Sequence, residues 1–104
     1  MVARVSVYEV PDDKADEAVE RFGEAIGEIR KMEGLQEVYF LVSPENGRAL
    51  TLTLWDSHVS ADASRVTASR LRTEAAREVD GGVVSVEEYD VAIHERAEIA
   101  TPTD

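Results

Sequence analysis

The chain has 104 residues, of which 43% are apolar and 32% are charged. This apolar fraction is enough to form one buried core, and the chain is too short to form two. It contains no cysteine, which excludes disulfides, cysteine zinc sites and thiol nucleophiles. Eleven basic against 22 acidic residues give a formal charge of −11, which argues against nucleic acid and membrane surfaces as partners. No apolar run approaches the roughly 20 residues of a membrane span and no signal-peptide pattern is present, so we expect a cytoplasmic protein.

The first half of the chain predicts a strand, a helix and a hairpin. Residues 2–10 alternate apolar and polar side chains as a strand does, and Pro11 ends it. Asp12 or Asp13 can cap a helix over about 14–33, whose apolar residues recur every three or four positions and which Gly34 stops. Strands over 35–42 and 48–55 flank Pro44-Glu45-Asn46-Gly47, a strong hairpin-turn signal.

The second half predicts one more helix and one more strand. Asp56 or Ser57 can cap a helix that runs to about Val79 on a narrow stripe of small residues, and Gly81-Gly82 breaks it. Residues 83–94 read as a final strand, kinked at Glu87-Glu88. We therefore expect one domain over 1–94 and a C-terminal tail over 95–104.

The order β-α-β-β-α-β predicts an α+β, ferredoxin-like domain with a four-stranded antiparallel sheet. Its first and third strands should be central, and both helices should cover one face. The strands over 35–42 and 48–55 are nevertheless apolar on both faces, with Leu50, Leu52 and Leu54 opposite Trp55. Because two helices cover only one face, we expect a homodimer in which two sheets pack together as a dimeric α/β barrel.

Several short motifs resemble the antibiotic biosynthesis monooxygenase-like family of the dimeric α/β-barrel superfamily. The resemblance covers residues 2 to about 93. It is carried by Met32-Glu33-Gly34-Leu35, the strand Leu50 to Trp55, Trp55-Asp56-Ser57, Ala63-Ser64, Arg70-Leu71-Arg72 and the Gly-Gly stop.

This resemblance implies a cofactor-independent monooxygenase-like protein that acts on a small aromatic or polyketide-like molecule. The alternative is a non-enzymatic, dimeric barrel that binds a small ligand or serves in stress. The quinone-forming members that this chain resembles carry an asparagine four residues before the tryptophan, where this chain has Thr51. The haem-degrading members use an asparagine, and the only asparagine here is Asn46 in the hairpin turn, so haem degradation is disfavoured.

The resemblance also implies that Trp55 lines a cavity between the sheet and the helices; the plainer interpretation is an indole that anchors the second helix. Strand periodicity puts Arg4, Ser6 and Tyr8 on one face of the first strand. It puts Thr51 and Thr53 beside Trp55 on one face of the third strand.

If these two stripes face the helices, with Phe22 opposite, they form a small-ligand site. Arg4 would then stabilise a substrate anion and Tyr8 would donate a hydrogen bond. Periodicity leaves open which face meets the helices, and Arg4 could instead reach solvent.

His58, three residues after Trp55, could act as a base at the cavity mouth or be a solvated residue of the first helical turn. His94 is expected at the surface. No pair of histidines or carboxylates has metal-ligand spacing, so no metal or other cofactor is expected.

Overall fold

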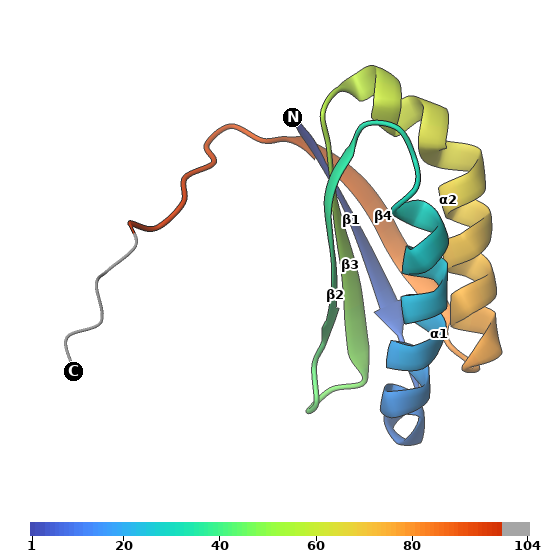
Figure 1. Ribbon diagram of the computed structural model, residues 1–104. Coiled ribbons are helices and arrows are strands. Elements are labelled where there is room, and N and C mark those ends of the chain that lie inside the picture. Colours follow the sequence, from blue (N-terminus) through green and yellow to red (C-terminus); the bar gives the residue numbers. More distant parts are fainter. Residues whose placement is uncertain (99–104) are drawn as a thin grey trace.

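The computed structural model describes residues 1–98 as one four-stranded antiparallel sheet with two helices on one face (Figure 1). The elements are β1 (Val2–Glu9), a 3-10 turn η1 (Asp12–Lys14), α1 (Ala15–Ile29), β2 (Leu35–Val42), β3 (Arg48–Trp55), α2 (His58–Glu78) and β4 (Gly82–Asp90). The strand order is β2-β3-β1-β4, with β1 and β3 central. The predicted α+β, ferredoxin-like fold is confirmed.

Both strands of the hairpin have the predicted bounds, whereas α1 is shorter than expected. Met32 continues the apolar spacing of α1, but the helix ends at Ile29. Lys31 and Met32 donate to carbonyls three residues back, so the chain tightens and then turns at Gly34, whose φ is 85°. Lys14 occupies the N-cap position of α1, and no side chain caps that end.

The second helix begins as expected, but its end differs. The Ser57 hydroxyl caps α2 by accepting a hydrogen bond from the Ser60 amide at 3.2 Å. After Glu78 the left-handed residue is Asp80, with φ 57°, rather than either glycine. Gly81 lies close to the Glu9 carbonyl instead, which leaves no room for a side chain.

The last strand ends at Asp90 rather than near residue 94. Asp90 pairs with Val2, where β1 begins, so the residues that follow have no strand left to pair with. We expected an irregularity in this strand at Glu87-Glu88, but the structure has it at Val84. Val84 has no pairing partner on β1, because Val7 pairs with Ser85 and Tyr8 pairs with Val83. Residues 91–98 leave the body of the protein (Figure 1), and residues 99–104 of the expected tail lie outside the described part.

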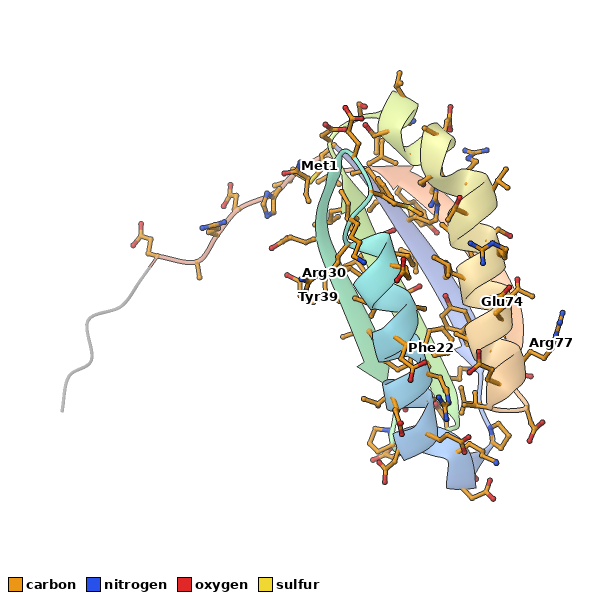
Figure 2. All side chains as sticks on the ribbon, turned by 45° about the vertical axis from the view of Figure 1, so that its right-hand side comes forward. Met1, Phe22, Arg30, Tyr39, Glu74 and Arg77 are labelled. Carbon is orange, nitrogen blue, oxygen red and sulfur yellow. The ribbon has the colours of Figure 1, made fainter. Side chains whose placement is uncertain are left out.

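The core lies between the sheet and the helices. Small residues on α2, such as Ala61, Ala68 and Ala75, let this helix approach the sheet closely. Phe22 projects from α1 onto the sheet (Figure 2), with ring centres 4.7 Å from Tyr8 and 4.6 Å from Phe40.

The opposite face of the sheet has no helix over it. Tyr39 and Leu41 on β2 are 45% and 50% exposed, and Tyr89 on β4 is 52% exposed. Leu50, Leu52 and Leu54 alternate with the buried side chains of β3 and therefore point to the same uncovered face. This open sheet face is the apolar surface that the sequence predicted would need covering.

Within residues 1–98, neither helix combines the length and the apolar character needed to cross a membrane.

Candidate functional site

The polar stripes of the two central strands face the helices. Arg4, Ser6 and Tyr8 on β1 are buried on this side, next to the stripe of β3. The antiparallel register sets Arg4 opposite Thr53 and Ser6 opposite Thr51. The structure thereby decides the question of orientation that periodicity left open: the two stripes lie side by side beneath α1 and α2.

These stripes form the floor of an inner cavity that α1 and α2 roof. Its aromatic walls are Phe22 and Trp55, and Ile26 and Ile29 of α1 lie above them. The remaining lining residues are Arg4, Tyr8, Ala25, Val38, Thr51, Thr53, Ala68 and Arg72. Only about 20 Å³ is open to the centre of a water molecule, space for about one water, so an aromatic ring can enter only if side chains of α1 move.

Two short hydrogen bonds fix the polar groups in the inner cavity. The Tyr8 hydroxyl shares a hydrogen bond of 2.8 Å with the Thr51 hydroxyl. The Trp55 indole N–H donates to the Thr53 hydroxyl at 2.9 Å, and its side chain is fully buried. Burial raises the pKa of Tyr8 above its ordinary value of 10.0, despite its hydrogen bonds and the nearby positive charge of Arg72, so this phenol stays neutral at neutral pH.

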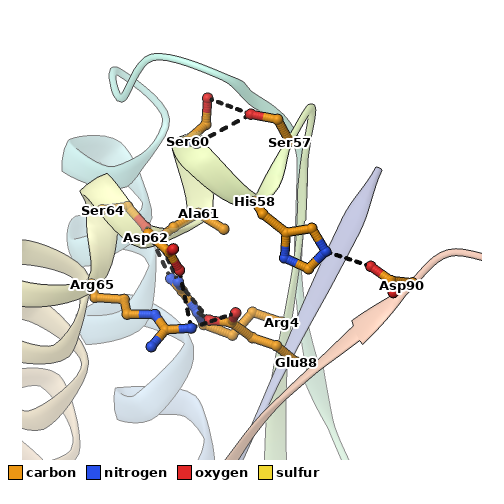
Figure 3. A network of polar contacts seen from close by, with 10 residues as sticks. All are labelled: Arg4, Ser57, His58, Ser60, Ala61, Asp62, Ser64, Arg65, Glu88 and Asp90. Atoms are coloured by element: carbon orange, nitrogen blue, oxygen red, sulfur yellow. Dashed lines mark hydrogen bonds and ion pairs between the residues drawn. The ribbon is translucent and has the colours of Figure 1, made fainter.

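Arg4 is held in place by partners on two other elements (Figure 3). Its guanidinium donates to the Glu88 carboxylate of β4 at 2.9 Å. Its other nitrogens donate to the Ser64 hydroxyl at 3.0 Å and the Ala61 carbonyl at 2.7 Å, both on α2. It also lies 5.4 Å from the centre of the Trp55 ring, within the range of a cation–π contact. Arg4 therefore joins β1, β4 and α2, and each of its three guanidinium nitrogens donates a hydrogen bond to one of these partners.

The Glu88 carboxylate links this cluster to the surface. It accepts a second hydrogen bond from Arg65 of α2 at 2.8 Å, and Arg65 also pairs with Asp62. Burial alone would raise the pKa of Glu88, but the hydrogen bonds from Arg4 and Arg65 outweigh it and hold this pKa below its ordinary value of 4.5.

Beside the inner cavity, α2 and β4 enclose an arginine cleft lined by Arg4, Arg65, Ser69, Arg72, Val86 and Glu88. It leaves about 370 Å³ for the centres of water molecules, within the range of roughly 300 to 1,000 Å³ found for ligand sites. Arg4 and Arg72 line both spaces. Arg65, Ser69 and Arg72 are not among the site residues predicted from the sequence, although their spacing of four and three residues puts them on one face of a helix.

Two residues that the sequence suggested for the site, Ser6 and His58, line neither the inner cavity nor the arginine cleft. Ser6 is buried under the helices but does not line the inner cavity. The His58 ring is 65% exposed and pairs with Asp90 at 2.6 Å (Figure 3), so this geometry gives no support to a base at the cavity mouth. His94 is exposed. Among residues 1–98, no three His, Asp or Glu side chains are close enough together to hold a metal ion.

The chain is a ferredoxin-like α+β protein with a cavity between its sheet and its two helices, and the sequence assigns it to one family. Residues 1–76 match the sequence profile of the antibiotic biosynthesis monooxygenase family, so the chain belongs to that family. No curated protein matches the sequence significantly.

Solved structures share the fold at low sequence identity. A Deinococcus radiodurans protein that carries the same family name is 12% identical, with a TM-score of 0.72 over 97% of this chain and 100% of its own. A Nitrosomonas europaea protein of that family name is 12% identical, with a TM-score of 0.69 over 89% of this chain and 100% of its own. The haem degrader MhuD from Mycobacterium tuberculosis, solved with two haems in its active site, is 18% identical, with a TM-score of 0.69 over 92% of this chain and 100% of its own. At these identities the similarity shows the fold.

Proposed function

We propose that this protein is a cofactor-independent monooxygenase that acts on a small aromatic or polyketide-like molecule bound between the sheet and the helices. The observation that supports this most directly is the inner cavity, where the one tryptophan, a neutral tyrosine and Phe22 meet in a member of the monooxygenase family. An apolar space with few, fixed polar groups is the usual composition of a small-molecule site.

The proposed chemistry uses the electrons of the substrate itself. A phenolic or enolic substrate releases a proton to solvent before it binds, and its anion transfers one electron to O₂. The resulting carbon radical and superoxide combine into a peroxide anion, which takes up a proton to become a hydroperoxide and then loses water to leave a ketone or quinone. One oxygen atom enters the product and the other becomes water, so a CH₂ group and O₂ become C=O and H₂O. The protein then has to bind the anion, exclude water and orient the ring.

The described contacts suggest a role for each side chain. Trp55 and Phe22 would hold the ring from two sides, and Tyr8, kept neutral by its raised pKa, would donate a hydrogen bond to a substrate oxygen. Thr51 and Thr53 position the Tyr8 hydroxyl and the Trp55 indole. Because Arg4 is engaged by Glu88, Ser64 and Ala61, its contribution would be to position Trp55 and the helix rather than to move toward the substrate.

We also propose that a second copy of the chain covers the open sheet face. Three leucines of β3 and the half-exposed Tyr39, Leu41 and Tyr89 form an apolar surface of the kind that seldom remains uncovered on a monomer. A second sheet with the same face would cover it by two-fold symmetry. The inner cavity lies on the other side of the sheet, so each copy would keep its own site.

The test is oxygen uptake with anthrone, a phenol-forming substrate whose anion reacts with O₂. We expect wild-type protein to consume one O₂ for each quinone formed, above the rate in buffer. Trp55→Phe should remain folded and lose most of this rate, whereas Arg77→Gln, which lies outside both spaces, should keep it. His58→Ala should keep the rate, because the His58 ring is exposed, pairs with Asp90 and lines neither space.

Each outcome separates the candidate functions. Quenching of Trp55 fluorescence by 2-hydroxy-1,4-naphthoquinone without oxygen uptake from anthrone would support the binding-only alternative. An absence of both responses, with Trp55→Phe only lowering the melting temperature, would show that the indole serves packing alone.

A further inference from the structure

The arginine cleft contains an excess of positive charge in a strongly acidic protein. Three arginines and one glutamate line it, which gives a formal charge of +2 (3 − 1), or +1 when Asp62, the other partner of Arg65, is counted. The whole chain carries −11. This local reversal of charge lies next to the aromatic inner cavity, because Arg4 and Arg72 line both spaces.

Two of the three arginines are engaged. Arg4 uses its guanidinium on Glu88, Ser64 and the Ala61 carbonyl, and only 3% of its side chain is exposed. Arg65 binds Glu88 and Asp62 (Figure 3). The single carboxylate of the cleft is therefore already neutralised by these two side chains.

Arg72 differs from both. Within residues 1–98 its guanidinium forms no ion pair and no hydrogen bond, and its Nε is buried without a partner. Buried polar groups without a partner are uncommon in proteins and cost on the order of 1–3 kcal/mol, more when charged. Burial lowers the pKa of Arg72 below its ordinary value. The nearby Tyr8 raises this pKa in part, and the like charge of Arg4 lowers it further. Arginine nevertheless stays protonated at neutral pH, so an unneutralised cation lies at the junction of the two spaces.

We propose that Arg72 is an anion-binding residue and that the ligand is an aromatic anion, whose charged oxygen atoms bind at Arg72 in the arginine cleft while its ring extends toward Trp55. This inference rests on the proposed function and names its substrate class. Carboxylate, phenolate and enolate oxygens share the needed chemistry, since each accepts charge-assisted hydrogen bonds from a guanidinium. The Ser69 hydroxyl provides a further donor in the cleft, and the larger volume there accommodates the polar end of the ligand.

The first experiment compares a charged and a neutral probe with the same ring system, 2-naphthoate and its methyl ester, by equilibrium dialysis against the full chain. We expect 2-naphthoate to bind about tenfold or more tightly, because only the anion can neutralise Arg72. The enolate of 2-hydroxy-1,4-naphthoquinone distinguishes the sources of the anion: tighter binding than naphthoate would indicate a phenolate- or enolate-type substrate rather than an aromatic acid.

The second experiment removes the charge. Arg72→Gln should weaken 2-naphthoate binding about tenfold or more and leave the ester unaffected, and Arg72→Lys should give an intermediate loss. Arg77→Gln is the matched control, because it removes the same charge from an exposed site on the same helix that projects away from the sheet (Figure 2). Circular dichroism establishes that each variant is folded, and the comparison of the two probes on wild-type protein needs no variant.

The outcomes separate this inference from the proposed function. Equal binding of acid and ester, unchanged by Arg72→Gln, would overturn the anion site while leaving the aromatic cavity in place. Binding of neither probe at millimolar concentration would overturn both. Binding of 2-naphthoate through Arg72 without oxygen uptake from anthrone would support the anion site and count against the monooxygenase chemistry.

Discussion

Replacing Glu88 by glutamine should destabilise the protein because it removes the negative charge that neutralises Arg4. Glutamine keeps the shape and one acceptor oxygen, but its hydrogen bonds to two guanidinium groups become neutral–charged ones. Arg4 is almost fully buried, so its bond carries most of the effect, while the bond from Arg65, 59% exposed, is screened by water. Hydrogen bonds to charged groups contribute about 1.5–3 kcal/mol, so we expect a loss of about 2 kcal/mol in the free energy of unfolding.

The loss should depend on pH in a defined direction. The pKa of Glu88 is lowered in the folded protein, so the ionised carboxylate stabilises the fold at pH values above its ordinary pKa of 4.5. That stabilisation disappears as the pH falls through the lower pKa of the folded state. The difference in stability between wild type and Glu88→Gln should therefore be largest at neutral pH and shrink as the pH falls below 4.5.

Urea unfolding followed by circular dichroism measures both effects, and thermal unfolding should show a decrease of about 8–16 °C at neutral pH. Glu20→Gln is the matched control. Glu20 is exposed on α1, away from the open sheet face, and its replacement should change stability by less than about 0.5 kcal/mol. Equal losses in both variants, or a Glu88→Gln loss that stays constant as the pH falls through the acidic range below 4.5, would refute the assigned role of the Arg4–Glu88 pair.

Two further predictions concern the backbone and the assembly. Gly27→Ala should stabilise the protein by about 0.5–1 kcal/mol, because Gly27 lies inside α1 and has open space around it. Gly34→Ala should destabilise the protein by more than about 1 kcal/mol, because φ is 85° at Gly34 and a side chain there would overlap Ser60. Equal shifts in urea midpoint for both would contradict this. Light scattering at micromolar concentration should report a dimer that tightens with added salt, because each dimer carries −22 (twice −11) and salt shortens the Debye length to about 8–10 Å. Leu52→Lys on the open sheet face should give a folded monomer and Val66→Lys on exposed α2 should not; a monomeric wild type would contradict the sheet-to-sheet arrangement.

The fold was predictable because each local signal agreed with the others. The strands over 35–42 and 48–55 are bounded by Gly34 and by the turn at Asn46-Gly47, and both have the predicted limits. The errors lie where a pattern continues beyond its structural support. Met32 extends the apolar spacing of α1, but the turn into Gly34 ends the helix at Ile29. Residues 91–94 extend the pattern of β4, but β1 has no further residue with which to pair.

The inner cavity could be predicted from the sequence only on the condition that the polar stripes of β1 and β3 face the helices. Alternation on β1 and β3 identifies which side chains share a face, and the resemblance placed Trp55 beneath the helices. Which face those helices cover depends on the packing of the whole sheet, which period-two alternation does not contain. His58 shows the converse limit: its distance of three residues from Trp55 in sequence suggested a shared site, but the turn into α2 directs its ring to Asp90 at the surface.

The roles of Arg4 and Arg72 could not be told apart from sequence, because the distinction depends on distant partners. Arg4 was the candidate for binding an anion, yet its main partner is Glu88, 84 residues away, and that contact neutralises it. Arg72 is one of several arginines on α2, and only packing shows that its neighbours there take the available carboxylate. Arg30, Arg48 and Arg77 likewise form no ion pair within residues 1–98, but they are exposed to water, whereas Arg72 is partly buried. Its Nε is buried without a partner within residues 1–98, which lowers the stability of the fold, and Arg72 also lines an adjoining cleft that is open enough to admit an anion.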